Sequence, residues 1–227
     1  MTSIFSITPS FLPIANSDQT FPVRRIYCVG QNYADHAREM GGDPDRNPPF
    51  FFTKPADAIV PSGSSVPYPP KTSNLHHEIE LVVAIGKAGA DIPVEQALEH
   101  IYGYTVGIDL TRRDLQAQAK KAGRPWDMAK GFDKSAPMAA LIPAEKLGHP
   151  SSGRIWLKVN DAMRQDSDLA KQIWSVPEAV AYLSTLVRLE PGDLLMTGTP
   201  DGVGAIERGD RVTGGIDGVG EITVTVD

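Results

Sequence analysis

Prolines and glycines divide this sequence into short segments, and this limits the folds that are open to it. The chain has 227 residues, of which 19 are proline and 21 are glycine, and both are spread along its length. Because proline and glycine interrupt helices and favour turns, the pattern predicts many short strands joined by turns. The length is enough for one substantial core, so a single domain is expected.

The apolar segments between these breaks are short, and most have the character of strands. Strands are predicted over residues 25–29, 50–53, 78–85, 102–108, 155–159, 194–197 and 222–226. Helices are predicted over residues 34–40, 94–100 and 111–121, and from residue 175 onward. Strands outnumber helices and do not alternate with them regularly, which argues against a doubly wound fold. The sequence therefore predicts a β-rich α+β domain with a rolled or sandwiched sheet.

Local signals define the ends of some of these elements. Thr111 is a candidate N-cap for the helix over residues 111–121. Ser175 starts the best-marked helix, because Glu178 completes a capping box with it. The glycines at 41 and 42 are expected to end the helical turn over residues 34–40, and residues 56–75, rich in proline and serine, are expected to form a surface loop.

Charge, cysteine content and hydropathy exclude several classes of protein. The formal net charge is -6 and no long Lys/Arg block is present, so a nucleic-acid groove is not expected. The single cysteine, Cys28, cannot form an internal disulfide and is interpreted as a buried small hydrophobe. No apolar run approaches the roughly 20 residues of a membrane helix, and no signal peptide pattern is present. These features predict a cytoplasmic protein without nucleic-acid or membrane partners.

Glu78 and Glu80 lie two residues apart in a predicted strand, so their carboxylates project to the same side. Two like charges about 4 Å apart repel by roughly 4 kcal/mol near a protein surface, and a divalent cation removes that cost. Asp109, at the end of the strand over residues 102–108, could supply a third oxygen. Three carboxylates suit Mg²⁺, Mn²⁺ or Ca²⁺ better than Zn²⁺. Taken alone, however, the Glu-x-Glu pattern is explained more simply as the solvent-exposed face of a strand.

Histidines near these acids offer a base or further ligands. His36 and Glu39 are three residues apart on a helical turn, where a carboxylate can orient an imidazole that takes a proton from water. An incidental surface pair is the simpler interpretation of this spacing alone. His76 and His77 adjoin the acidic pair, and because neighbours in an extended chain point to opposite sides, at most one of them faces it.

Two further positions could contact an anionic substrate. Lys130, flanked by small residues, could reach into a pocket, although a solvated lysine explains it equally well. Thr199, at a tight Gly-Thr-Pro corner, could present a backbone amide to a carboxylate. The Gly-rich tail lacks the Gly-Lys-Ser/Thr of a phosphate loop, and no Gly-x-Ser-x-Gly elbow is present, so a serine hydrolase would lack its nucleophile.

Taken in order, short motifs resemble the fumarylacetoacetate hydrolase family. The motifs are Cys28–His36 with Glu39-Met40, His77–Leu81, Gly107–Thr111, Arg113–Gln116, Arg124–Trp126 with Lys130, Leu157–Asn160 and Thr197–Gly204. Together they cover residues 24 to 226, nearly the whole chain. The sequence is most similar to the compact acylpyruvate and fumarylpyruvate hydrolase branch, which lacks the large N-terminal domain of fumarylacetoacetate hydrolase itself.

The resemblance implies a mixed, rolled β-sandwich in one catalytic domain over residues 24–227, after an N-terminal arm over residues 1–23, and a homodimer. It also implies roles for individual residues. These are metal binding by Glu78, Glu80 and Asp109 (Mg²⁺ or Mn²⁺, with Ca²⁺ a further option), water activation by His36 and Glu39 on a lid segment, and substrate contact by Lys130, Gln116 and Thr199.

These roles predict metal-dependent hydrolysis of a carbon–carbon bond in a small 2,4-diketo acid. Fumarylpyruvate, an intermediate of gentisate breakdown that would yield fumarate and pyruvate, is the first choice of substrate. Decarboxylation of oxaloacetate or isomerisation of an unsaturated diacid would use the same metal site and remains the alternative. A non-catalytic metal- or ligand-binding protein is a third interpretation. Hydrolysis is preferred because His36 and Glu39 supply a water activator.

Overall fold

The apolar strand β8 (Ile79–Ile85) lies at the centre of a large sheet in the computed structural model, which describes residues 4–40 and 47–227. Antiparallel partners flank β8 on both sides. In order, the sheet contains β4 (Phe51–Lys54), β3 (Arg25–Val29), β15 (Asp193–Met196), β8, β9 (Ile101–Ile108), β11 (Ala136–Met138) and β5 (Ile59–Pro61), and β12 (Ile142–Pro143) also pairs with β9.

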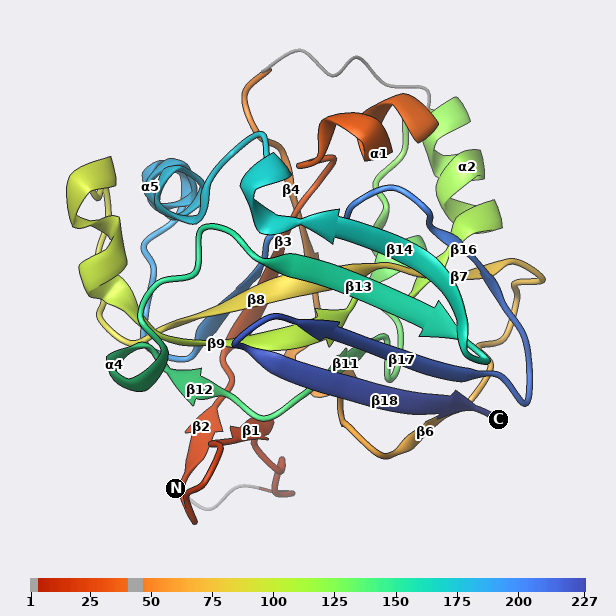
Figure 1. Ribbon diagram of the computed structural model, residues 1–227, viewed down its shortest axis with the longest axis horizontal. Coiled ribbons are helices and arrows are strands. Elements are labelled where there is room, and N and C mark those ends of the chain that lie inside the picture. Colours follow the sequence, from red (N-terminus) through yellow and green to blue (C-terminus); the bar gives the residue numbers. More distant parts are fainter. Residues whose placement is uncertain (1–3, 41–46) are drawn as a thin grey trace.

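A second sheet packs against this one. Its order is β14 (Ala162–Asp168), β13 (Arg154–Val159), β17 (Arg211–Ile216), β18 (Gly220–Val226) and β6 (Ser65–Val66). Figure 1 shows β13, β14, β17 and β18 lying in front of β8 and β9. Two smaller sheets complete the strands: β10 (Thr111–Arg112), β7 (Leu75–His77) and β16 (Gly204–Ile206), and the hairpin of β1 (Phe11–Pro13) and β2 (Thr20–Pro22).

Alternation along β8 explains why both of its faces are buried. Leu81 and Val83 belong to the apolar cluster between the two sheets, together with Leu157 of β13. Val82 and Ala84 point the other way, into a cluster that covers the second face of the large sheet. A strand with both faces covered is expected to be apolar throughout, as β8 is after Glu80.

The helices are short and lie around the sheets. They are α1 (Ala34–Glu39), α2 (Arg113–Lys121), α3 (Asp127–Lys130), α4 (Ala144–Leu147) and α5 (Val176–Leu186), with 3-10 turns η1 (Ala56–Ala58), η2 (Val94–His100) and η3 (Leu169–Lys171). In Figure 1, α1 and α2 lie at the same end of the molecule, with α2 above β7 and β16. Within residues 4–40 and 47–227, none of the helices has the length and apolar character needed to cross a bilayer.

The α+β fold with a curled, two-layered sheet is confirmed, and so are several local signals. The capping box at the start of α5 is present, with the Ser175 N–H donating to Glu178 at 3.0 Å. Cys28 is fully buried, and burial raises the pKa of its thiol well above the usual value. The predicted end of α1 at glycines 41 and 42 lies outside the described residues.

Two local predictions were wrong. Residues 56–75 are not one loop, because β5 pairs with β11 and β6 pairs with β18, both from distant parts of the sequence. Strands of two or three residues are too short to show a period. Thr111 is not the N-cap of α2. It belongs to β10, where it pairs with His76 of β7, and its hydroxyl donates to the Asp109 carbonyl at 3.2 Å. The helix starts at Arg113.

The N-terminal residues are tied to the core. Leu12 of β1 and Phe21 of β2 are buried in the cluster on the second face of the large sheet. The division of the chain into an arm over residues 1–23 and a catalytic domain over residues 24–227 stays a prediction.

The double-sided burial of β8 can be tested on Leu81, which is fully buried between the sheets. Leu81→Ala should lower the free energy of unfolding by about 2–5 kcal/mol, because it leaves a cavity that the neighbouring strands cannot close. Urea denaturation followed by circular dichroism measures the change. Leu186→Ala is the matched control, since Leu186 is 59% exposed at the end of α5 and should cost less than about 0.5 kcal/mol. Similar losses in both variants would contradict the packing of β8.

Candidate active site

The three carboxylates predicted to bind metal meet where β8 begins and β9 ends. Antiparallel pairing sets Ile79 opposite Ile108, and the Asp109 N–H donates to the Glu78 carbonyl at 2.8 Å. This register places Asp109 beside Glu78, with Glu80 two residues along the same strand. One ligand atom from each of the three residues lies within 4.8 Å of the other two. All three are buried, so an exposed strand face, the simpler interpretation of the Glu-x-Glu pattern, is wrong.

Cationic side chains from three other segments surround these acids. Lys130, at the end of α3, donates to Glu78 Oε2 at 2.8 Å and to Asp109 Oδ2 at 2.6 Å. Arg113, the first residue of α2, forms a short ion pair with Glu78. Lys54, the last residue of β4, lies with its Nζ 2.8 Å from Asp109 Oδ1, and its side chain is fully buried. Glu78 and Asp109 therefore hold three other segments of the chain at this edge.

Burial and neighbouring charges shift the pKa values of the two glutamates in opposite directions. Burial raises the pKa of Glu80 well above its usual value, and the charges of Asp109 and Glu78 raise it further. Burial alone would also raise the pKa of Glu78, but the charges of Lys130 and Arg113 hold it well below its usual value. Burial lowers the pKa of the Lys130 ammonium, and the charges of Asp109 and Glu78 outweigh that effect and raise it. Among the described residues, Glu80 forms no ion pair, and the charge of nearby Lys130 only partly offsets the effects that raise its pKa.

The cluster fits a hard divalent cation. Its donors are carboxylate oxygens alone, the set that Mg²⁺, Mn²⁺ and Ca²⁺ prefer. Asp109 Oδ1 is buried and accepts no hydrogen bond from the described residues, since its contact with Lys54 is an ion pair without hydrogen-bond geometry. Such an oxygen has a lone pair available for a metal. A bound cation would also remove the repulsion that raises the pKa of Glu80.

His36 and Glu39 form the expected pair on α1. His36 Nδ1 lies 3.1 Å from Glu39 Oε2, and His36 is buried while the Glu39 side chain is 33% exposed. The other carboxylate oxygen, Glu39 Oε1, accepts from the Gly202 N–H at 3.3 Å. Glu39 therefore links the histidine to the loop that follows β15.

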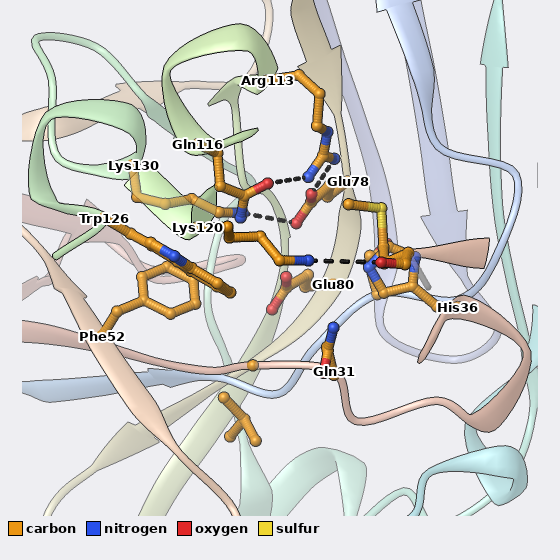
Figure 2. Close-up of a pocket in the computed structure, with 14 residues that line it drawn as sticks. Gln31, His36, Phe52, Glu78, Glu80, Arg113, Gln116, Lys120, Trp126 and Lys130 are labelled. Atoms are coloured by element: carbon orange, nitrogen blue, oxygen red, sulfur yellow. Dashed lines mark hydrogen bonds and ion pairs between the residues drawn. The ribbon is translucent and has the colours of Figure 1, made fainter. Parts of the chain in front are cut away.

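These groups share one cleft, whose lining residues are drawn in Figure 2. Six of the eight predicted site residues line it: His36, Glu78, Glu80, Gln116, Lys130 and Thr199. Glu39 and Asp109 are not among the lining residues, but each contacts one that is. Residues far apart in the sequence are thus brought together in one cleft, and their individual roles stay a prediction.

The loop after β15 is held to the carboxylates by backbone and amide contacts. The Gly198 N–H donates to Glu80 Oε2 at 2.7 Å. Gly198 has a φ of +92°, and a Cβ there would lie 2.6 Å from the Asn32 Cβ, so only glycine fits. Gln165, fully buried on β14, donates to Thr199 Oγ1 at 2.8 Å and accepts from the Ile79 N–H at 3.1 Å. One side chain thus joins the second sheet, the start of β8 and the Thr199 corner.

Neither histidine beside Glu78 joins the metal cluster in the described part of the chain. His77 is fully buried, with Nδ1 3.1 Å from Gln165 Oε1, and burial lowers its pKa to about 4. His76 contacts Asn74 and Arg113, and burial lowers its pKa to about 4 as well. Both are interpreted as neutral side chains that support the site without facing its centre.

Several lining residues were not predicted. Phe52, Trp126, Gln31 and Lys120 line the cleft, and Lys54 and Gln165 hold its walls. A signal existed for one group, since Arg113, Gln116 and Lys120 are spaced three and four residues apart on one helix. Gln165 and Lys54 had none, because their roles depend on contacts between distant segments.

Comparison with known proteins gives one consistent relationship. Residues 25–227 match the family model for the fumarylacetoacetate (FAA) hydrolase C-terminal domain. The structure of fumarylpyruvate hydrolase from Pseudomonas aeruginosa in complex with Mn²⁺ and pyruvate is 58% identical, with a TM-score of 0.97, and 99% of each chain is covered. Mouse (Mus musculus) oxaloacetate tautomerase FAHD1 is 45% identical over 86% of this chain and 88% of its own length. Fumarylpyruvate hydrolase from a Ralstonia species is 48% identical over 78% and 92%.

The bridging role of Gln165 can be tested by removing its amide. Gln165→Leu keeps the approximate volume but leaves the buried Ile79 N–H and Thr199 hydroxyl without their partner. Because an unpaired buried polar group costs about 1–3 kcal/mol, we expect a loss of at least about 2 kcal/mol in the free energy of unfolding. Gln118→Leu, on the exposed face of α2, is the matched control and should change it by less than about 0.5 kcal/mol. A Gln165 variant as stable as the control would exclude this role.

Proposed function

This chain belongs to the fumarylacetoacetate hydrolase family, and from that premise we propose that it is a metal-dependent hydrolase that cleaves a carbon–carbon bond of an acylpyruvate. The observation that carries the proposal is the joint presence in one cleft of the buried carboxylate cluster and the His36–Glu39 pair. The carboxylates alone would support several reactions of a 2-keto acid. The paired histidine adds a group suited to taking a proton from water.

Glu78, Glu80 and Asp109 would hold Mg²⁺ or Mn²⁺, which when bound would orient the diketo acid and polarise its oxygens. A hydrogen bond from His36 Nδ1 to Glu39 leaves Nε2 with the free lone pair. His36 Nε2 then takes a proton from water as the hydroxide adds to the distal ketone. The carbon–carbon bond breaks, giving a carboxylic acid and the enolate of pyruvate, and the Lys130 ammonium stabilises the negative charge before a proton returns to carbon.

Fumarylpyruvate is the substrate that we propose, with fumarate and pyruvate as products. Support comes from two relatives named as fumarylpyruvate hydrolases, 48% and 58% identical to this chain. The homodimer implied by the resemblance also stays a prediction.

Conversion between the keto and enol forms of oxaloacetate is a second candidate function. The relatives named oxaloacetate tautomerase FAHD1 are 42–45% identical to this chain over at least 86% of its length. Tautomerisation moves a proton and consumes no water, so it would need the metal cluster and a proton carrier. Turnover of a panel of acylpyruvates and of enol-oxaloacetate, followed by loss of enol absorbance with Mn²⁺ present, would separate the two.

The metal site predicts the behaviour of a glutamate variant. Glu80→Gln removes a ligand charge from the cluster and should abolish tight Mn²⁺ binding, measured by calorimetry, together with turnover of every substrate. Circular dichroism should show that the fold is retained. Glu95→Gln, at an exposed position on η2, is the control and should bind Mn²⁺ as the unmodified protein does. Unchanged affinity in Glu80→Gln would exclude this site.

The role of His36 predicts a difference between two reactions in one variant. His36→Ala should lower acylpyruvate hydrolysis by about 10²–10⁴-fold, the usual effect of losing a general base. Oxaloacetate decarboxylation, which needs no attacking water, should survive far better if the protein supports it. Glu39→Gln should act as a milder form of the same change, since the imidazole keeps a partner without its charge. Equal losses in both reactions would show that His36 does not act on water.

A further inference from the structure

One face of α2 provides a row of polar groups from the floor of the cleft to its mouth. Arg113, Gln116 and Lys120 are spaced at i, i+3 and i+7, so they lie on the same side of the helix, and all three line the cleft. Arg113 is at the inner end, paired with Glu78, and it also donates to Gln116 Oε1 at 2.5 Å. Lys120 is at the outer end and is exposed.

Lys120 differs from the other cations of the cleft. Arg113 and Lys130 are paired with carboxylates of the metal cluster. In the part of the chain that the structure describes, Lys120 forms no ion pair, and its ammonium makes a single long contact, 3.4 Å, with the Met40 carbonyl at the end of α1. Figure 2 shows its side chain extending toward His36, with Glu80 just below it in the view. A positive charge at the mouth is therefore available to a ligand.

The spacing of residues along α2 indicates which part of a ligand would reach the Lys120 ammonium. Seven residues separate Lys120 from Arg113, which corresponds to roughly 10 Å along α2 at the usual helical rise. A seven-carbon chain such as that of fumarylpyruvate spans roughly 8 Å, and the flexible lysine can cover the difference. The two-carbon acyl group of acetylpyruvate ends well short of it.

The wall between the two ends suits a flat, unsaturated chain. Phe52 and Trp126 line the cleft with their ring centroids 5.8 Å apart, and the Lys130 ammonium lies 5.0 Å from the centre of the Phe52 ring. Both rings are partly exposed and so present apolar surface to a ligand. A conjugated acyl group could pass along them from the metal cluster toward the mouth.

We propose that Lys120 binds a carboxylate at the far end of the acyl group, so that the cleft selects acylpyruvates that are dicarboxylates. This inference rests on the proposed acylpyruvate hydrolysis. The pyruvate end lies at the carboxylate cluster, and the acyl chain follows the α2 face past Gln116. The terminal carboxylate then replaces the Met40 carbonyl as the hydrogen-bond partner of the Lys120 ammonium. Lys120 is thus a specificity-determining residue.

The test compares two substrates on the Mn²⁺-loaded protein: fumarylpyruvate, with a terminal carboxylate, and acetylpyruvate, without one. Lys120→Gln should lower the ratio of their kcat/KM values by about tenfold, mainly through a higher KM for fumarylpyruvate, because a charge-assisted hydrogen bond is lost. Lys120→Arg should restore most of the ratio. Lys121→Gln, which removes the neighbouring charge outside the cleft, should leave both substrates unaffected.

Ionic strength gives a second measurement. In the unmodified protein the KM for fumarylpyruvate should rise with salt more steeply than that for acetylpyruvate, since an exposed ion pair is screened. Lys120→Gln should remove that difference. A purely structural role for Lys120, such as holding α1 through Met40, would change both substrates alike and leave the salt dependence as it was.

The outcomes separate this inference from the function on which it rests. If the unmodified protein hydrolyses both substrates and the ratio is unchanged in Lys120→Gln, the inference is wrong and the hydrolase proposal stands. Arg124 lines the adjoining hollow with Phe52 and Trp126. If the ratio of kcat/KM values falls in Arg124→Gln instead, Arg124 is the residue that binds the terminal carboxylate, and the assignment of Lys120 is overturned. If neither substrate is hydrolysed, the proposed function fails and the inference falls with it.

Discussion

Burial of three carboxylates at one edge of the large sheet is the constraint on which the rest of the site depends. Each ion removed from water costs several kcal/mol unless an opposite charge compensates it. Here the compensation comes from Lys54 and Lys130, with Arg113 as the third cation. These three belong to β4, α3 and α2, so those elements must dock at the same edge for the carboxylates to remain buried. The carboxylates that could hold a metal thus also influence how the surrounding chain packs.

The site is built from two parts that are held in different ways. The carboxylates sit on paired strands, where register leaves little freedom. His36 and Glu39 sit on a six-residue helix whose outer end is held by Glu39 to the Gly202 N–H. Relatives named as fumarylpyruvate hydrolases are 48% and 58% identical to this chain, and those named as oxaloacetate tautomerase are 42–45% identical. Both named activities are compatible with a site of two separately held parts, because two reactions could share the carboxylate cluster and differ in what the helix contributes.

The sequence predicted the parts that depend on local pattern and on motif order. Alternation in the strand over residues 78–85 predicted that Glu78 and Glu80 project to the same side, and both contribute ligand atoms to one cluster. Six of the residues that line the cleft were named in advance as site residues. Lys54 and Gln165 were not predicted, because the sequence does not distinguish a buried lysine or glutamine from an exposed one. Their contacts follow only from strand pairing between distant segments. The two-residue strand β6 was not predicted for the same reason.

Charge balance explains why an anionic substrate would depend on the metal in this cleft. When Glu80 is ionised, Glu78, Glu80 and Asp109 contribute three formal negative charges, and Lys54, Lys130 and Arg113 contribute three positive ones, so the inner end of the cleft has no net formal charge. A neutral inner end offers a keto-acid carboxylate little attraction, and the cations there already have partners. A divalent cation would shift that end to two positive charges, enough to hold a carboxylate and a neighbouring keto oxygen. The inner end would then differ from the mouth, where the charge of the exposed Lys120 would be screened by salt.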